Sequence, residues 1–299
     1  MKIAFGMIVF EGDYVLKQCL ESVYDIAEQI LIAEGPVKYW QQQGRTTSKD
    51  RTNEILNSFP DPKNKIKIVH GQFNEKDDQC NTYIKHMHSD IDYLWNLDSD
   101  EIYKQQDIEN LIKLLEKDQY TSVGIRSCSF YGGFDRYISG FEEAKDNFLR
   151  VFKVTPGCTW RTHRPPTILY SSNITKKHLD SDTLYDLTGM RMYHYSYVFP
   201  KQVYNKINYY MNIGGMGNRI PNYFFNVYWP WINGNDQIKQ EIENKYVGVH
   251  EYLPQGRGPS FTKLLETEHP ISIKNNIIEL RERFNIEVNI VKNKLNKQV

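Results

Sequence analysis

Short apolar runs alternate with amphipathic stretches through the first 120 residues of the chain. The apolar runs have the length of strands and cover residues 2–10, 29–33, 65–70 and 92–97. Apolar residues recur at helical spacing between and after these runs, in residues 14–27, 50–59, 77–87 and 107–115. Continuous apolar runs are typical of strands buried on both faces. Strands that alternate with helices predict a doubly wound, mostly parallel sheet.

The pattern changes after residue 120. The composition of residues 121–130, 148–154 and 191–197 predicts strands, antiparallel or mixed. Turns are predicted at Gly132-Gly133 and Pro156-Gly157. Helical patterns then dominate, in residues 202–211, 235–244 and 274–284. We therefore predict an α/β domain over residues 1–200 and a helical C-terminal extension over residues 201–299. The aromatic stretch 223–234 fits an acceptor platform, a dimer surface or the core of the extension, so an oligomer is one of the options.

The composition limits the kinds of partner that the chain can bind. Lys and Arg number 37, as do Asp and Glu, so the chain has no global field for nucleic acid or for an anionic membrane. No apolar stretch is long enough to span a bilayer, and the N-terminal run has no cleavage site after it. The four cysteines lack metal-binding or disulfide-framework spacing, which favours buried reduced thiols in a cytoplasmic protein.

Acidic residues follow three of the predicted strands. Glu11 and Glu34 come after the first and second strands, and Asp98-Ser99-Asp100-Glu101 comes after the fourth. Ligands of such sheets bind at the carboxyl ends of the strands, so these side chains predict a site. Two carboxylates one residue apart suit Mg²⁺ or Mn²⁺, which keeps positions open for phosphate oxygens. A bound ion of this kind would neutralise a diphosphate leaving group.

Several motifs, taken in order, resemble family 2-type glycosyltransferases of the GT-A fold. The sequence pieces are Met7-Ile8-Val9 before Glu11, Ser48-Lys-Asp50-Arg-Thr52, the Asp98 to Glu101 motif, Arg150-Val-Phe-Lys with Gly157, Trp160 and His163, and His194-Tyr-Ser-Tyr with Lys201 and Lys206. The similarity covers residues 1–210. It implies a nucleotide-sugar-binding half over residues 1–120 and an acceptor-side half over residues 121–200.

The resemblance also implies roles for particular residues. Glu11, Glu34, Asn81 and Asp98 would bind the nucleotide-sugar donor, with UDP the expected nucleotide. Asp98 and Asp100 would hold Mn²⁺ or Mg²⁺, and His194 would complete the metal site, with His250 as the other candidate ligand. The reaction would transfer a sugar, with inversion, to a hydroxyl acceptor such as a glycan.

Inverting transfer needs a general base that takes the proton of the acceptor hydroxyl. We expect His163 in that role, with Asp135, Glu142 and Glu143 as the alternatives. Glu101 is the second predicted catalytic residue, or it shapes the metal turn. Arg45, Lys49 and Arg51 form a basic loop that would hold the diphosphate, a role that Arg161 and Arg164 beside His163 could also take.

Two other functions fit parts of the pattern. A sugar nucleotidyltransferase has a similar sheet, but its first loop is rich in glycine and basic residues, whereas this chain has Phe10-Glu11-Gly12-Asp13. A nucleotide-sugar-binding module that has lost its chemistry is favoured by Arg164, which stands where the family often carries an acid. The intact Asp98 to Glu101 motif argues against it.

Overall fold

The computed structural model describes residues 1–139, 148–171, 173–212, 220–247, 249 and 260–296. The chain forms two compact units that are interleaved along the sequence. Unit 1 comprises Met1–Arg126 and Asn147–Met192, and unit 2 comprises Ser127–Asp146 and Tyr193–Val299. The domain boundary expected after residue 200 stays a prediction.

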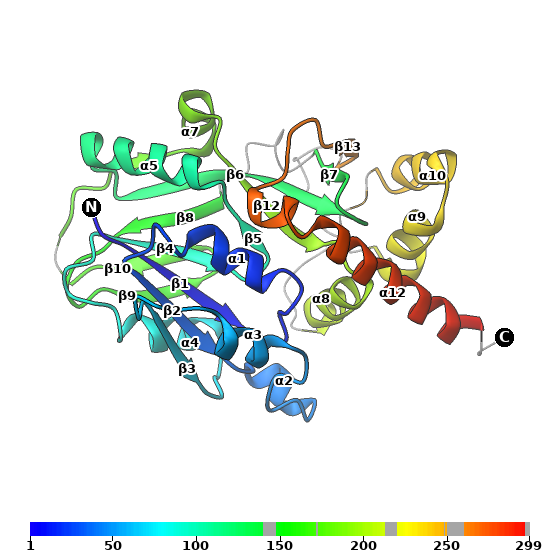
Figure 1. The fold of residues 1–299 in the computed structure, drawn as a ribbon, viewed down its shortest axis with the longest axis horizontal. Coiled ribbons are helices and arrows are strands. Elements are labelled where there is room, and N and C mark those ends of the chain that lie inside the picture. Colours follow the sequence, from blue (N-terminus) through cyan, green and yellow to red (C-terminus); the bar gives the residue numbers. More distant parts are fainter. Residues whose placement is uncertain (140–147, 172, 213–219, 248, 250–259, 297–299) are drawn as a thin grey trace. The chain divides into compact units, whose positions relative to one another are not determined.

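Unit 1 is built on the mixed, mostly parallel sheet that the sequence predicts. Its strands lie in the order β6-β8-β4-β1-β2-β3, and β11 pairs with β6 (Figure 1). Strands β1, β2, β3 and β4 are parallel, and β8 runs antiparallel to both β4 and β6. The bounds are β1 Ile3–Val9, β2 Gln29–Glu34, β3 Ile66–His70, β4 Tyr93–Asp98, β6 Ser122–Tyr131, β8 Phe148–Lys153 and β11 His178–Leu179. All four predicted N-terminal strands are confirmed.

The central strand β1 is covered on both faces. Its odd-numbered residues join a core with the apolar sides of α1, Leu16–Val23, and α5, Gln105–Asp118. On the opposite face, Gly6 lies against Tyr83 of α4, Lys76–Ile84, so closely that a Cβ at Gly6 would come 2.5 Å from the tyrosine ring. Glycine at this position therefore allows α4 to approach the sheet.

The helical predictions hold with shifted ends. The helix expected over residues 14–27 is shorter and covers Leu16–Val23. Its N-cap is Val15, and Asp13 does not cap it. Asp13 instead accepts a hydrogen bond from the backbone of Arg51. Residues 38–42, before the basic loop, form a short helix, α2, Lys38–Gln42, and the next helix is α3, Thr52–Ser58.

Three short strands and one helix complete the described part of unit 1. A two-residue strand, β5, Glu101–Ile102, follows β4. A separate hairpin pairs β9 with β10, antiparallel, and β9 also contacts α4. The remaining bounds are β9 Thr159–His163, β10 Pro166–Leu169 and α7 Ser181–Thr188.

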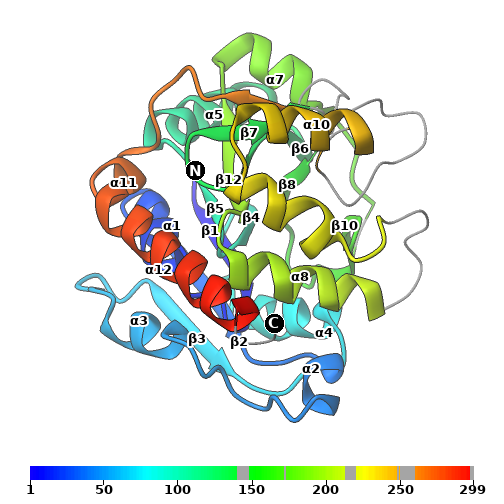
Figure 2. The same cartoon turned by 90° about the vertical axis from the view of Figure 1, so that its right-hand side faces the viewer.

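Unit 2 holds the end of β6 and most of the C-terminal half. The strand β7 pairs with β6 and with β13, both antiparallel. Helix α8 contacts α12 and the π-helix η1, and α9 contacts α10 (Figure 2). The bounds are β7 Arg136–Ile138, β12 Arg191–Tyr197, α8 Pro200–Asn212, η1 Phe224–Tyr228, α9 Trp229–Asn233, α10 Asp236–Tyr246, β13 Thr262–Leu264, α11 Ile271–Lys274 and α12 Ile277–Asn296.

Most of the aromatic stretch is core. Tyr223, Phe224, Tyr228 and Trp231 are buried in one cluster of unit 2, whereas Phe225 is exposed. Of the three interpretations of this stretch, the structure favours core of the extension. None of the described helices is long and apolar enough to cross a membrane.

Candidate active site

The acidic residues that follow the strands meet at one edge of the sheet. In the β1–β2 pairing Val9 is opposite Glu34, and in the β1–β4 pairing Ile8 is opposite Asp98. Glu11 lies two residues beyond β1, with a left-handed backbone (φ 48°) that is uncommon for a glutamate. The carboxyl ends of β4, β1 and β2 thus bring Glu11, Glu34 and Asp98 to neighbouring positions, as the sequence predicts.

Glu34 is the buried centre of a polar cluster at the end of β2. Only 5% of its side chain is exposed, and its carboxylate accepts a 2.6 Å hydrogen bond from the Ser48 hydroxyl. The ring of His70, at the end of β3, lies 2.9 Å from the other carboxylate oxygen. Ser48 in turn accepts a hydrogen bond from the backbone N–H of Glu11. Because His70 also follows a parallel strand, the rule that found Glu34 could have found it.

The basic loop before α3 is engaged with protein groups. Arg45 forms an ion pair with Glu11, and its guanidinium stacks 4.0 Å from the ring centroid of Trp40. Arg51 pairs with Glu54 on the exposed side of α3. Two of the three residues expected to hold a diphosphate are therefore paired with carboxylates in this structure.

The Ser-x-Asp-x-Thr motif fixes the loop that follows β1. Thr52 accepts a hydrogen bond from the N–H of Gly12, and Asp50 accepts one from the N–H of Asp13. Burial, with the nearby charge of Asp13, raises the pKa of Asp50 above its usual value. These contacts join the chain after β1 to the start of α3, so the motif shapes the wall of the site.

Glu101 is buried in an ion pair with Arg150. The carboxylate has no exposed surface, and Arg150 Nε lies 3.0 Å from each of its oxygens. Glu101 also accepts hydrogen bonds from the Tyr103 hydroxyl and, at 3.4 Å, from the backbone N–H of Asp98. A carboxylate enclosed in this way does not reach a substrate, which favours the alternative expectation that Glu101 shapes the turn after β4.

Asp98 lies at the end of β4 among several cationic groups. Its Oδ2 is 3.5 Å from Arg150 Nη2, and its Oδ1 is 4.0 Å from His163 Nε2. Burial alone would raise the pKa of Asp98, but the charges of Arg150, Arg164 and Lys76 hold that pKa well below its usual range. Asp98 is therefore ionised at neutral pH. Asp100, two residues on, is half-buried in the turn after β4.

His163 is enclosed although it ends the hairpin strand β9. The residue is 4% exposed, and neither ring nitrogen has a hydrogen-bond partner in the described part of the chain. Burial lowers the pKa of His163 to about 3, against the opposing effect of Asp98. The imidazole is thus neutral at physiological pH, and a group with so low a pKa is a poor proton acceptor.

Helix α4 holds β9 in place. The Asn81 amide donates to the carbonyl of Trp160 and accepts from its N–H, at 2.9 and 2.8 Å. The carboxylate of Asp77 accepts a hydrogen bond from the N–H of His163. Asn81, expected to bind the donor, uses both ends of its amide to position the strand that carries His163.

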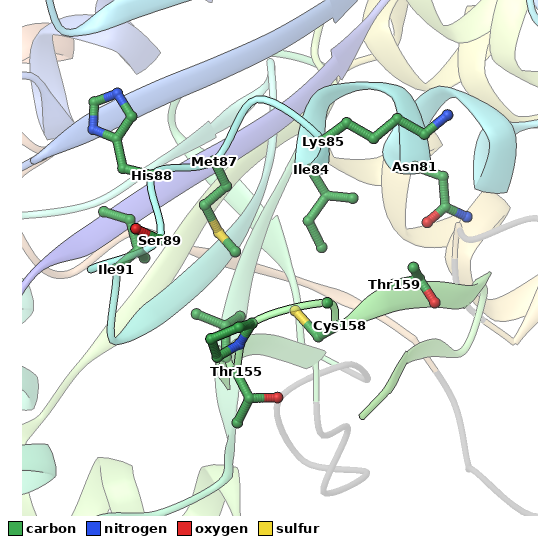
Figure 3. Close-up of a pocket in the computed structure, with 13 residues that line it drawn as sticks. Asn81, Ile84, Lys85, Met87, His88, Ser89, Ile91, Thr155, Cys158 and Thr159 are labelled. Atoms are coloured by element: carbon green, nitrogen blue, oxygen red, sulfur yellow. The ribbon is translucent and has the colours of Figure 1, made fainter. Parts of the chain in front are cut away.

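A mainly apolar cavity of about 570 Å³ lies between the C-terminal half of α4 and the segment before β9. Figure 3 shows Ile84, the last residue of α4, on one side, pointing toward Cys158 on the other. Asn81 is the one predicted site residue among those that line it. The cavity is therefore separate from the carboxylates at the strand ends.

The other predicted metal ligands and general bases belong to unit 2 or fall outside the described residues. His194 is half-buried in unit 2, where its Nδ1 is 3.5 Å from the Ser129 hydroxyl, and its role as a metal ligand stays a prediction. Asp135, also in unit 2, forms an ion pair with Arg281. Glu142, Glu143 and His250 lie outside the described residues.

The donor set fits a divalent cation that relies on its substrate for ligands. Among the residues that the structure describes, no three His, Cys, Asp or Glu side chains form a ready-made metal site. Mg²⁺ and Mn²⁺ are commonly held by one or two carboxylates, with phosphate oxygens and water supplying the other ligands. Ionised Asp98 and, two residues on, the half-buried Asp100 are carboxylates of that kind.

Part of the chain matches the model of a known protein family. The family model described as "Glycosyl transferase family 2" matches residues 46–193. No curated protein matches the chain.

Solved structures that are similar to the chain include TarS 1-349 of S. aureus in complex with UDP-GlcNAc. It is 14% identical with a TM-score of 0.34, over 45% of this chain and 36% of that one. TarS 1-349 without ligand is 11% identical with a TM-score of 0.37, over 51% and 47% of the two chains. A 4-diphosphocytidyl-2C-methyl-D-erythritol synthase of Anaerococcus prevotii is 12% identical with a TM-score of 0.31, over 51% and 70%. The chain spans less than half the length of the TarS 1-349 structures that it matches.

Proposed function

Because the chain carries a glycosyltransferase family 2 domain, we propose that it transfers a sugar from a UDP-linked donor to a hydroxyl acceptor, with inversion and with the help of Mn²⁺ or Mg²⁺. The observation that supports this most is the meeting of Glu11, Glu34 and Asp98 at the carboxyl edge of β4, β1 and β2. Ligands of open α/β sheets bind at this edge. The free thiols of all four cysteines agree with a cytoplasmic location, which we also propose.

The nucleoside would bind at the β2 end of this edge. Glu34 is held by Ser48 and His70, so its carboxylate is oriented before a ligand arrives. Arg45, stacked on Trp40 and paired with Glu11, lies in the loop beside it. A charged group fixed in this way contributes to binding without an ordering cost.

Asp98 and Asp100 would hold the divalent ion next to the diphosphate. The bound ion would neutralise charge that develops on the leaving nucleoside diphosphate. Arg150 and Glu101 keep Asp98 in place, since Arg150 contacts both carboxylates and Glu101 accepts from the Asp98 backbone.

The acceptor hydroxyl must lose its proton as it attacks the anomeric carbon. The burial of His163 and its pKa of about 3 argue against the base role expected for it. Of the alternatives, Asp135 is exposed and forms an ion pair with Arg281, and Glu142 and Glu143 lie outside the described residues.

Thermal unfolding in the presence of nucleotides tests this proposal. The protein is mixed with UDP, GDP or CDP, with the corresponding nucleotide sugars, and with or without Mn²⁺. A ligand at 100 times its Kd stabilises the folded state by about 2.7 kcal/mol, which corresponds to a rise in Tm of roughly 5–10 °C. We expect such a shift with UDP and Mn²⁺ together.

Variants show whether the shift comes from this site. Asp100→Asn should remove the effect of Mn²⁺ on nucleotide binding. Asp118→Asn is the matched control, because Asp118 pairs with Lys177 on the exposed surface of unit 1. The absence of a shift with every nucleotide, with and without metal, would contradict the proposed donor site.

A further inference from the structure

The cavity of about 570 Å³ beside α4 has no part in the proposed function. All the residues that line it belong to unit 1. Sites for small molecules commonly enclose about 300–1,000 Å³ and are largely formed before the ligand binds. The volume of this cavity therefore suits a small organic ligand.

The first wall of the cavity is the end of α4 and the segment that follows it. Ile84 ends the helix, and its carbonyl accepts a hydrogen bond from the N–H of Met87. Gln29 of β2 holds the next turn, because its amide donates to the carbonyl of His86 and accepts from the N–H of His88, at 2.9 and 3.0 Å. This wall is therefore fixed to the central sheet.

The second wall is the chain between β8 and β9. It turns at Pro156-Gly157, where the N–H of Cys158 donates to the carbonyl of Thr155 and Gly157 has a left-handed φ of 76°. The carbonyl of Pro156 also accepts a hydrogen bond from the Ser171 hydroxyl. Because both walls are held in this way, a ligand would bind at little ordering cost.

The interior of the cavity is apolar. The buried residues that line it are Ile84, Ile91, Val154 and Cys158. Figure 3 shows the side chain of Ile84 directed across the space toward Cys158. An apolar ligand group gains free energy when it leaves water for such surroundings. The interior therefore favours an alkyl chain or another apolar body.

Positive charge lies at the mouth of the cavity. Lys85 and His88 line it and are exposed, and none of the described residues that line it is acidic. Asp90, which follows this segment, is paired with Lys2 at 2.6 Å. A ligand that carries an anionic group at one end would match this distribution of charge.

We propose that this cavity binds a small organic anion with an apolar body, such as the carboxylate of a medium-length alkyl chain. The chain would lie among Ile84, Ile91 and Val154, and the carboxylate would lie at the mouth near Lys85. Each methylene group that the cavity buries would tighten binding by about fourfold. The proposal does not rest on the proposed function, since the carboxylates at the strand ends do not line this cavity.

Isothermal titration calorimetry with decanoate, decanol and acetate tests the proposal on the full chain. We expect decanoate to bind, acetate not to bind because it lacks the apolar body, and decanol to bind about two- to fivefold more weakly because it lacks the charge. Lys85→Glu should weaken decanoate binding by at least the same factor and leave decanol binding unchanged. Lys113→Glu is the matched control, because Lys113 is an exposed lysine of α5 and does not line the cavity.

Two further measurements locate the bound ligand. Ile84→Trp fills the cavity and should weaken decanoate binding by at least about tenfold, the effect of excluding two methylene groups. Met87→Trp, at a half-buried position of the same wall, serves if Ile84→Trp does not fold. A photoreactive alkyl carboxylate should form cross-links, identified by mass spectrometry, within residues 81–91 and 154–159.

Each part of the proposal has a result that would overturn it. Failure of decanoate to bind the wild type would exclude the proposed ligand class. Full binding to the tryptophan variant, or cross-links that lie outside these two segments, would exclude the cavity as the site. Equal binding of decanol and decanoate, unaffected by Lys85→Glu, would exclude the role of charge. None of these results bears on nucleotide binding, which is measured separately.

Discussion

Replacing Arg150 by methionine should destabilise unit 1 more than any surface charge removal. Arg150 is 8% exposed in its side chain and Glu101 is 0% exposed, so the variant leaves a buried carboxylate unpaired beside Asp98. Breaking a buried ion pair in this way costs about 3–5 kcal/mol. At about 2–4 °C per kcal/mol, the expected fall in Tm is roughly 6–20 °C.

The matched control is Arg126→Met. Arg126 pairs with Asp182 in the same unit, but the two side chains are 22% and 26% exposed. Solvent screens such a pair, so its loss should cost no more than about 1 kcal/mol. A double variant, Arg150→Met with Glu101→Leu, removes both charges and should recover much of the lost stability.

The pH dependence gives an independent check. In the wild type, the lowered pKa of Asp98 adds stability that is present above the unfolded-state pKa and is lost as the pH falls. Without Arg150, burial raises the carboxylate pKa in the folded state, so the variant binds protons on folding and gains stability as the pH falls. The Tm difference between wild type and Arg150→Met should therefore narrow from pH 7 to about pH 4. A deficit no larger than that of Arg126→Met, or one that widens on acidification, would refute this reasoning.

Three further predictions concern unit 1 and the thiols. Gly35→Ala should greatly reduce stability to urea, because Gly35 has φ +143° and a Cβ there would lie 1.9 Å from the backbone oxygen of Gly71. The control Gly44→Ala, at φ +72° with open space around it, should cost only about 1 kcal/mol. A similar loss in both would contradict the steric argument. Burial raises the pKa of Asp107 to about 6, so Asp107→Asn should raise Tm at pH 7.5. The gain in Tm should disappear below about pH 4, where the carboxyl is protonated in both the folded and the unfolded state. A gain in Tm that is constant with pH would refute this prediction. Burial also raises the pKa of Cys19 and Cys80, so a thiol reagent at pH 8 should modify neither before the protein unfolds, and rapid labelling of the native protein would oppose this.

The sequence was sufficient to place the sheet edge and its acids. Each of the first four strands is a short run rich in apolar residues, and parallel strands fix which ends meet, so the positions of Glu34 and Asp98 followed from the pattern alone. His70 obeys the same rule and was missed as a site residue only because a histidine at a strand end carries little signal by itself.

The partners of the acids were not predictable in the same way. Glu101 and Arg150 are 49 residues apart, and their pairing depends on how β8 lies beside β4. The position of His163 depends on the contact of Asp77 with its N–H and of Asn81 with Trp160 in the same strand, which no local pattern records. Periodicity reports which face of an element is buried, but not which side chain of another element covers it.

We propose that this chain cleaves the bond between a sugar and a nucleoside diphosphate. The most direct test is the release of UDP from UDP-sugars by the purified protein with Mn²⁺, with water as the acceptor. We predict slow release by the wild type, loss of release in Asp98→Asn and Asp100→Asn, and unchanged release in the surface variant Asp118→Asn. Nucleotide binding without release from any nucleotide sugar would contradict the claim and favour a binding module that has lost its chemistry.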